Sequence, residues 1–323
     1  MLLSKILFVY AVPAIRRRFF DYGPRAVEQV VKEGTSRPHT SASSSSERNM
    51  TANDPTAALL DHFASYRVPH GWFIHFYFLS VGLSILWAHQ IWMRRPAFEF
   101  LAAHSGVKLE NSMSANRAAL GWCFMLVQGL RRLVECVLFA KRSSSQMWIG
   151  HWVLGLLFYA FMSISVWIEG SRMHTIDDYS ALADSATASL LDQSRPCTSV
   201  ADYGELLSQN ILPTCLFFFA SGAQFRAHQH LASLPAAPNY ALPTAMVFNR
   251  TLTPHYFAEC LVYFALSRLA APEGQILNKT IASALAFEVI NLGITADQTY
   301  KWYERRFGPQ SIKSRARMVP GVW

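Results

Sequence analysis

Apolar runs of about 20 residues recur along the chain, and short polar or basic clusters separate them. A helix of this length is long enough to cross the hydrocarbon core of a bilayer. A shorter apolar run, Met1 to Ile15, ends at the arginines Arg16 to Arg18 and predicts a first membrane helix. The pattern predicts six further membrane helices, at residues 72–93, 118–140, 147–170, 211–234, 254–271 and 275–296. We therefore expect an all-α, polytopic membrane protein with seven transmembrane helices.

Polar segments divide the predicted helices into regions. The serine-rich run at 41–46 cannot bury a core, and it predicts a disordered linker over residues 35–66. A second polar loop is expected at 171–210. The chain thus divides into a first helix with its basic flank (1–34), the linker (35–66) and a six-helix core with a basic tail (67–323).

The composition supports a membrane protein. Hydrophobic residues make up 51% of the chain and charged residues only 15%, whereas soluble domains carry charge on nearly a quarter of their residues. The formal net charge of +8 comes from basic clusters at the ends of the apolar runs, which is the positive-inside pattern rather than a nucleic-acid surface. This pattern places the tail in the cytosol. The five cysteines show no metal-ligand or disulfide spacing, so no metal site is expected.

Charged residues interrupt the third predicted helix near its centre. Arg131, Arg132 and Glu135 stand three and four positions apart, so either arginine can pair with the glutamate along the helix. Central charges cost about 3 kcal/mol each in a membrane segment. A structural ion pair is one explanation. The surplus positive charge favours a second, an anion site, because arginine suits bidentate contact with phosphate.

Polar residues also mark the fifth and sixth helices. Gln224 and His228 share one face of the fifth helix, and with Arg226 they suit a water-facing cofactor mouth. In the sixth, His255 and Glu259 are four residues apart and share a face. A carboxylate this deep in an apolar segment needs a partner, and we expect Glu259 to orient a nearby cation. The alternative for both helices is an ordinary polar contact at the membrane interface.

Several of these blocks resemble, in order, the motifs of the steroid 5-alpha-reductase family, and specifically its polyprenol (polyprenal) reductase branch. The blocks that carry the resemblance are Val68-Pro69 with His75-Phe76-Tyr77, Arg131 to Cys136, Ala223 to His228, Pro254 to Glu259, and the tail with Trp302-Tyr303, Phe307, Lys313 to Arg315 and Pro320. The chain departs from the family at His255, where Asn is usual. It also lacks the usual His before the final aromatic pair and the usual Tyr-Pro before the basic tail.

The resemblance implies a seven-helix enzyme of the endoplasmic reticulum membrane, with its active site facing the cytosol and NADPH as cofactor. The implied reaction reduces the alpha-isoprene double bond of a long polyprenoid, giving the dolichol used in protein glycosylation. The implied partners are the polyprenoid substrate and membrane lipids, with no nucleic acid and no obligate protein partner. The residues implied on the cofactor side are Arg132, Gln224, Arg226, His228, His255, Tyr256, Glu259, Tyr303, Lys313 and Arg315.

The chemistry favours an aldehyde as the immediate substrate. A conjugated aldehyde accepts hydride at its β carbon when a donor polarises the carbonyl oxygen, and the α carbon is then protonated. An isolated allylic alcohol accepts hydride poorly. Tyr77, His75 and Glu135 are the candidates for carbonyl polarisation and proton delivery, although an aromatic belt at the membrane interface also explains Tyr77. A membrane methyltransferase using S-adenosylmethionine and a non-catalytic lipid carrier are the competing hypotheses.

Overall fold

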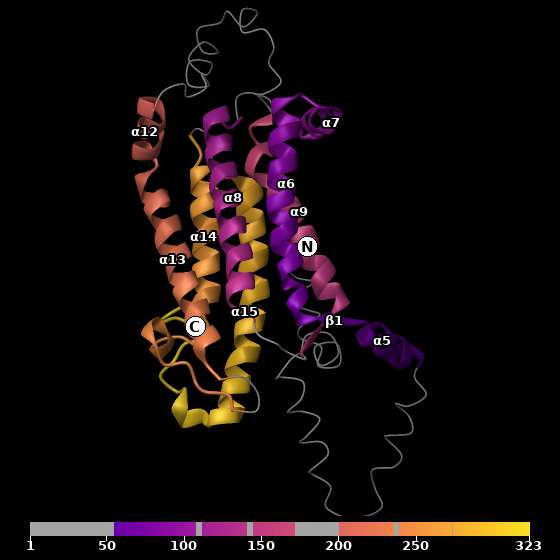
Figure 1. Cartoon of the computed structure of the whole chain (residues 1–323), viewed down its shortest axis with the longest axis vertical. Coiled ribbons are helices and arrows are strands. Elements are labelled where there is room, and N and C mark those ends of the chain that lie inside the picture. The colour runs from indigo at the N-terminus through magenta and orange to yellow at the C-terminus, as the bar shows by residue number, and fades with distance from the viewer. Residues whose placement is uncertain (1–54, 108–111, 141–144, 172–199, 236–238, 273) are drawn as a thin grey trace, which may run out of the picture.

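The computed structural model describes residues 55–107, 112–140, 145–171, 200–235, 239–272 and 274–323. The predicted first membrane helix and the serine-rich run lie outside these residues. Within the described ranges the chain is mostly helical, and its long helices stand side by side in one upright bundle (Figure 1). These long helices are α6 (Ile74–Trp92), α8 (Ala115–Leu138), α9 (Ile149–Ile168), α13 (Ile211–Ser233), α14 (Pro254–Leu269) and α15 (Lys279–Phe307).

Each of the six long helices corresponds to one of the helices predicted for the core. The main difference is α15, which continues to Phe307 instead of ending near residue 296. Three helical segments of the described chain are long and apolar enough to cross a membrane: His70–Trp92, Ile149–Ile168 and Lys279–Phe307. Helix α8 carries internal charges, α13 has a polar C-terminal half, and α14 has only 16 residues. The mostly helical, membrane-protein class is therefore confirmed, while the number seven stays a prediction.

Three short helices lie in segments that the hydropathy pattern did not predict as helical. Helix α5 (Pro55–Ser65) occupies the end of the predicted linker, and α12 (Val200–Gln209) occupies the end of the predicted polar loop. Helix α7 (Pro96–His104) follows α6 and begins with a proline, whose missing N–H costs nothing in the first turn. Their sequences favour helix through good helix formers such as Leu and Ala rather than through a long apolar run.

A small antiparallel sheet joins the ends of two long helices. Strand β1 (Arg67–Pro69) pairs with β2 (Gln146–Trp148), with Arg67 opposite Trp148. The 3-10 turn η1 (His70–Phe73) leads from β1 into α6, and α9 begins directly after β2. The pairing therefore fixes the start of α6 beside the start of α9.

Helices α6 and α9 approach closely because α9 has a glycine at the contact. A Cβ on Gly155 would lie 2.7 Å from the ring of Phe76, so no larger residue fits there without movement. Phe76 stacks on Tyr159, with ring centroids 6.2 Å apart. The next residue of α6, Tyr77, meets the same tyrosine edge-on at 5.4 Å. This contact places two buried tyrosines next to each other inside the bundle.

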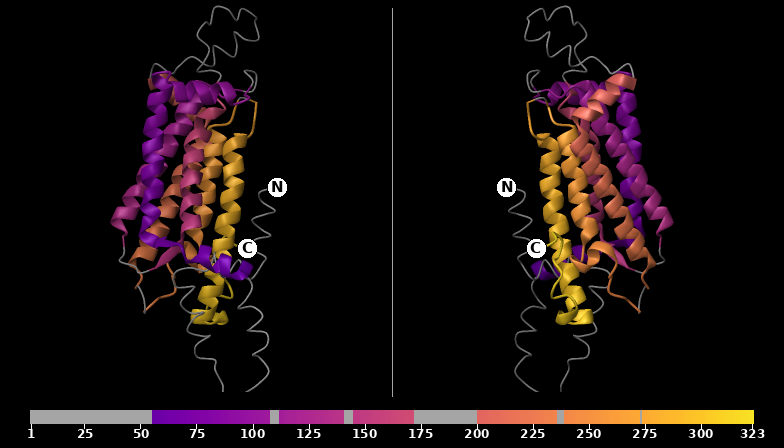
Figure 2. Two further views of the ribbon diagram at one scale, coloured as in Figure 1. Left: turned by 90° about the vertical axis from the view of Figure 1, so that its right-hand side faces the viewer. Right: turned by 90° about the vertical axis from the view of Figure 1, so that its left-hand side faces the viewer.

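The tail folds back on the segment that precedes α14. Thr251 and Ala316 form a parallel bridge, and the backbone N–H of Leu252 donates to the carbonyl of Ala316 at 2.9 Å. The hydroxyl of Thr253, the N-cap of α14, donates to the carbonyl of Arg317 at 2.7 Å. The first turn of α14 is thus fixed from outside the helix. The side views show this C-terminal region at one end of the bundle (Figure 2).

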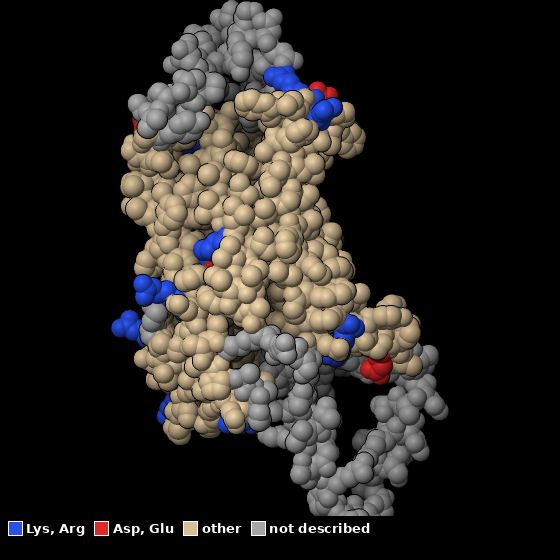
Figure 3. Space-filling model, in the orientation of Figure 1, with Lys and Arg blue, Asp and Glu red and all other residues tan. Residues whose placement is uncertain are grey.

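The surface charge follows the same long axis. In the face shown in Figure 3, lysines and arginines gather toward the two ends of the bundle, and a broad uncharged belt separates them. One basic patch interrupts this belt near mid-height. A belt of this kind is the surface that a bilayer covers.

Candidate functional site

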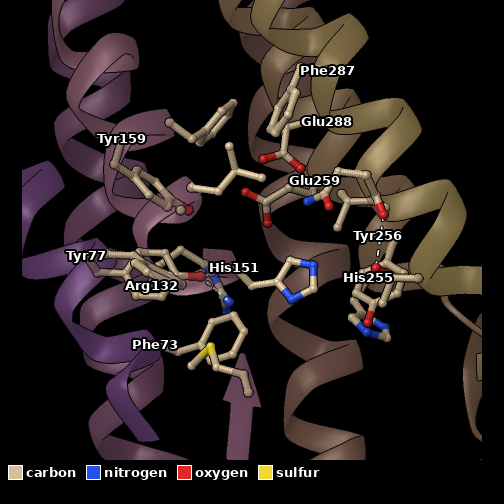
Figure 4. A pocket seen from close by; sticks show the side chains of 18 of the residues that line it. Phe73, Tyr77, Arg132, His151, Tyr159, His255, Tyr256, Glu259, Phe287 and Glu288 are labelled. Carbon is tan, nitrogen blue, oxygen red and sulfur yellow. Dashed lines mark hydrogen bonds between the residues drawn. The ribbon is translucent and has the colours of Figure 1, made fainter. Parts of the chain in front are cut away.

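A pocket lies inside the bundle, where all six long helices contribute side chains to its wall (Figure 4). Aromatic and aliphatic residues from α6, α9 and α15 form its apolar part, including Phe76, Phe158 and Phe287. Such a mixture of apolar walls and a few convergent polar groups is typical of a small-molecule site. The polar residues that line it are Tyr77, Arg132, His151, Tyr159, Gln224, His228, His255, Tyr256, Glu259, Glu288, Asn291, Thr295 and Gln298.

Tyr77 and Arg132 form the clearest polar contact in the pocket. The Nη2 and Nε atoms of Arg132 donate to the hydroxyl oxygen of Tyr77 at 2.7 and 3.1 Å. Two donors on one phenol oxygen occupy both of its lone pairs. The phenol hydrogen must therefore point elsewhere.

Glu135 fixes the position of Arg132 through an ion pair. Its carboxylate accepts from Nη1 of Arg131 and from Nη1 of Arg132, and it is 2% exposed. The Nδ1 atom of His228 lies 2.7 Å from Oε2 of Glu135 and 2.7 Å from Nη1 of Arg132. Glu135 is not among the residues that line the pocket. The structure therefore places it as a group that positions Arg132 and His228, not as a group facing the pocket.

The amide of Gln224 links the carboxylate of Glu259 to Arg131. Gln224 accepts from Nη2 of Arg131 through its oxygen and donates to Oε2 of Glu259 through its nitrogen. This orientation is the one that the partners require, because guanidinium only donates and a carboxylate only accepts. The sequence predicts that Glu259 orients a nearby cation, and that role stays a prediction. The structure gives it an amide partner, and the arginine lies one step behind.

Two histidines extend the polar wall on the α13 and α14 side. The rings of His228 and His255 meet edge-on, with centroids 5.3 Å apart, and Tyr256 lies against His255 at 4.2 Å. The Nδ1 atom of His255 is buried and has no hydrogen-bond partner among the described residues. A buried polar atom that faces a pocket without a partner is a feature that a ligand would satisfy.

Helix α15 contributes a polar face that the sequence analysis missed. Glu288, Asn291, Thr295 and Gln298 are spaced by three, four and three residues, and all four line the pocket. Residues at this spacing share one side of a helix. The signal was present in the sequence, because Glu288 is a carboxylate within an apolar segment. Tyr159 and His151 of α9 were missed as well, since neither belongs to a recognisable motif.

Besides Glu135, five of the sequence-predicted site residues do not line the pocket. His75 packs between aromatic rings instead, 5.2 Å from Trp72 and 6.0 Å from Trp152. Arg226 is exposed and lies, with Arg131, in an outward-facing groove between α8 and α13. The other three belong to the C-terminal region.

Tyr303 is buried in a separate cluster with Leu252 and Ile312. Lys313 is exposed, and Arg315 donates to the carbonyl of Pro243 at 2.7 Å. Arg315 thus connects the tail to the loop before α14, and Tyr303 packs in the same region.

Comparison with known proteins agrees with this architecture. Residues 194–323 match the family model described as 3-oxo-5-alpha-steroid 4-dehydrogenase. The C-terminal part of the chain is therefore similar to the family that the motifs resemble.

Similar proteins extend the match over most of the chain. The chain is 26% identical over 295 residues to "Polyprenal reductase 1" of Oryza sativa subsp. indica, which covers 80% of each protein. It is 25% identical over 271 residues to "Polyprenal reductase" of Saccharomyces cerevisiae, covering 84% of this chain and 81% of the relative. The same name belongs to a protein of Xenopus laevis that is 25% identical over 271 residues, covering 78% of this chain and 76% of the relative. The resemblance to the polyprenal reductase branch is thus confirmed.

Proposed function

We propose that this protein reduces the α,β double bond of polyprenal, with NADPH as hydride donor, and so supplies dolichal for dolichol synthesis. The observation that carries the proposal is the pair of Arg132 and Tyr77, which presents a phenol donor to a pocket with an aromatic wall. The similarity to polyprenal reductases supports the substrate class.

The residues on the α13, α14 and α15 side fit a dinucleotide cofactor. His255 offers a buried nitrogen without a partner, and His228 and Arg132 supply donors for an anionic or amide group. We infer that His228, His255, Tyr256 and Gln298 hold the cofactor, as the family resemblance implies for the first three. The exposed position of Arg226 fits this role poorly. When bound, the cofactor supplies the hydride that the protein itself lacks.

In the proposed mechanism, Tyr77 donates a hydrogen bond to the aldehyde oxygen of the substrate. This bond strengthens as negative charge develops on that oxygen, and Arg132, through its bonds to the phenol, helps to stabilise that charge. Glu135 keeps Arg132 in place and compensates part of its charge. The aromatic wall around Phe76 and Phe158 excludes water and holds the isoprene unit next to the aldehyde.

Location and topology follow from the same proposal. We infer an enzyme of the endoplasmic reticulum membrane in which α8, α13 and α14 cross the bilayer together with the three apolar spans. Arg132 of α8 faces the pocket inside the bundle, and Arg131, in the groove between α8 and α13, pairs with Glu135 and Gln224, so the cost of these charges in lipid is reduced. A first membrane helix before residue 55 would complete the seven.

The test uses the full-length protein in lipid nanodiscs with polyprenal, polyprenol, NADPH and S-adenosylmethionine. We expect NADPH to be oxidised with polyprenal and mass spectrometry to show a product two hydrogens heavier. The same mixture with polyprenol should give little product. Methylation of a lipid by S-adenosylmethionine, without NADPH oxidation, would overturn the proposal in favour of a methyltransferase. In cells that lack the protein, polyprenol should accumulate as dolichol falls.

A further inference from the structure

Two carboxylates face the pocket from neighbouring helices. Glu259 of α14 and Glu288 of α15 both line it, and Figure 4 shows them turned toward the same space, opposite Tyr77 and Tyr159. Two carboxylates that share a low-dielectric site cannot both be ionised at low cost. One of the two must therefore carry a proton, and their surroundings decide which.

The surroundings of the two groups differ. Glu259 accepts a hydrogen bond from Gln224, whose amide is held in turn by Arg131. A hydrogen bond to the charged form favours the carboxylate. Glu288 is 9% exposed and has a side-chain hydrogen bond with Asn291, but in the part of the chain that the structure describes no ion pair joins it to a cation, and no arginine stands behind its amide partner in any hydrogen bond described. The burial of Glu288 and its lack of a cation thus favour Glu288 as the group that carries the proton.

A protonated acid on this wall has a use in the reaction proposed above. Addition of hydride to the β carbon breaks the C=C π bond and leaves an enolate, whose oxygen lies at Tyr77 in that proposal. Its α carbon then needs a proton, and Tyr77 is already engaged with the oxygen. Glu288 lies across the pocket from Tyr77, on the side where a second group can reach the substrate (Figure 4).

Resting on the proposed function, we propose that Glu288 is the catalytic acid that protonates the α carbon of the substrate. The O–H bond of the Glu288 carboxylic acid breaks, a C–H bond forms at the α carbon, and the enolate becomes the saturated aldehyde. Glu288 is left as a carboxylate and takes a new proton from water. Asn291, Thr295 and Gln298 continue the polar face of α15 along the pocket and provide polar groups for that water.

The first arm of the test needs no ligand. Infrared difference spectra of the ligand-free protein, recorded in H₂O and D₂O, report the carbonyl stretch of a protonated carboxylic acid. We expect this band in the native protein and in Glu99→Gln, a matched change of an exposed glutamate on α7. It should disappear in Glu288→Gln. In Glu259→Gln it should persist at acidic pH, because burial still disfavours the charged form of Glu288 although loss of the neighbouring charge makes it easier to ionise. A band that is lost in Glu259→Gln and kept in Glu288→Gln would overturn the proposal.

The second arm follows the proton during turnover in D₂O, with the aldehyde product reduced at once by borohydride. The native protein should place deuterium on one face of the α carbon. Glu288→Gln should bind polyprenal and NADPH normally, lose about 10²–10⁴-fold in kcat, and scatter deuterium over both faces in its residual product. Native kcat with single-face deuteration in this variant would refute the role of Glu288.

Two further comparisons distinguish failure of the proposed role of Glu288 from misfolding of the variant and from failure of the proposed function. If Glu288→Gln does not fold, Glu288→Asp retains an acid at the same position and should keep both the infrared band and single-face deuteration at reduced kcat. Absence of the band in a folded Glu288→Asp contradicts the proposal. If the native protein does not reduce polyprenal at all, the proposed function fails, and the infrared result still decides the protonation of Glu288.

Discussion

The guanidinium of Arg132 contacts both the hydroxyl and the ring of Tyr77: Nη2 lies 2.7 Å from the phenol oxygen, and Cζ lies 4.8 Å from the ring centroid. The arginine therefore fixes the direction of the phenol as well as its charge environment. The tyrosine is 5% exposed, so water competes little for its hydrogen. A donor that is fixed and dry before the reaction begins needs no reorganisation when charge develops.

Removing this hydroxyl should slow the reaction without emptying the site. Tyr77→Phe keeps the ring that packs on Tyr159 and loses only the donor. We expect kcat to fall by about 10²–10³-fold, which is the usual effect of deleting one such donor. Steady-state kinetics with polyprenal and a binding assay for NADPH measure the two effects separately. A variant with native kcat would show that Tyr77 does not polarise the carbonyl.

The motifs imply that Arg132 and Arg226 both lie on the cofactor side, but replacing each by alanine should affect the apparent Michaelis constant for NADPH differently. Arg132→Ala removes a pocket-lining cation, and lost charge-assisted bonds cost about 1.5–3 kcal/mol. The apparent Michaelis constant for NADPH should therefore rise more than that for the lipid. Arg226→Ala removes an exposed guanidinium outside the pocket and should leave both constants near native values. Equal increases in the two variants would mean that the cofactor reaches the outer groove.

Glu135 should matter most for stability. Its carboxylate compensates two arginines and lies at the α8–α13 contact, so Glu135→Leu leaves two partly buried cations without this counter-charge. We expect a loss of about 3–5 kcal/mol in the free energy of unfolding. Thermal unfolding in detergent measures this loss, and Glu205→Gln at an exposed position of α12 is the control. Native stability of Glu135→Leu would show that the ion pairs are not formed in the folded protein.

Asn278 should stabilise α15 from its first turn. Its side-chain oxygen accepts from the backbone N–H of Ile281 at 2.8 Å, and its nitrogen donates to the carbonyl of Ala270 at 3.1 Å. The residue is fully buried, so water cannot replace either bond. Asn278→Ala should lower the free energy of unfolding by about 1–2 kcal/mol, and hydrogen exchange should rise first at the start of α15. Ser283→Ala, on an exposed face of α15, should change neither quantity.

The long helices of the core could be predicted from sequence because about 20 apolar residues have few alternatives in a membrane. The continuation of α15 to Phe307 could not, because the apolar run ends before Asp297 while the helix does not. Helices α5 and α12 could not be predicted from hydropathy for a related reason. A short helix needs no apolar run, so hydropathy gives no signal for it.

Helical phase explains why His75 and Arg226 point away from the pocket. Residues two apart on a helix differ by about 200° around its axis. If Tyr77 faces the pocket, His75 must face away, and the structure places it between two tryptophans. If Gln224 and His228 face the pocket, Arg226 between them must face outward. The motifs group His75 with Tyr77, and Arg226 with Gln224 and His228. Helical spacing alone predicts that His75 and Arg226 lie on the opposite face of their helices.

Glu288 shows what motif reading leaves out. It stands alone in an apolar run, with no neighbour that marks it, and its relation to Glu259 depends on how α14 packs against α15. Sequence reasoning could have singled it out as a buried carboxylate. Only the packing shows that a second carboxylate shares its pocket.

The return of the tail to the start of α14 has a consequence for biosynthesis. Thr251, Leu252 and Thr253 take their hydrogen-bond partners from residues 316–318, which leave the ribosome only after α15 has been made. Helix α14 places His255, Tyr256 and Glu259 in the wall of the pocket. The start of this helix is fixed only after residues 316–318 have bonded to residues 251–253. A ribosome that stalls after α15, or a protease that cuts between α15 and residue 315, would leave every long helix in place. The resulting protein would insert and pack, yet the wall of its pocket would remain loosely held.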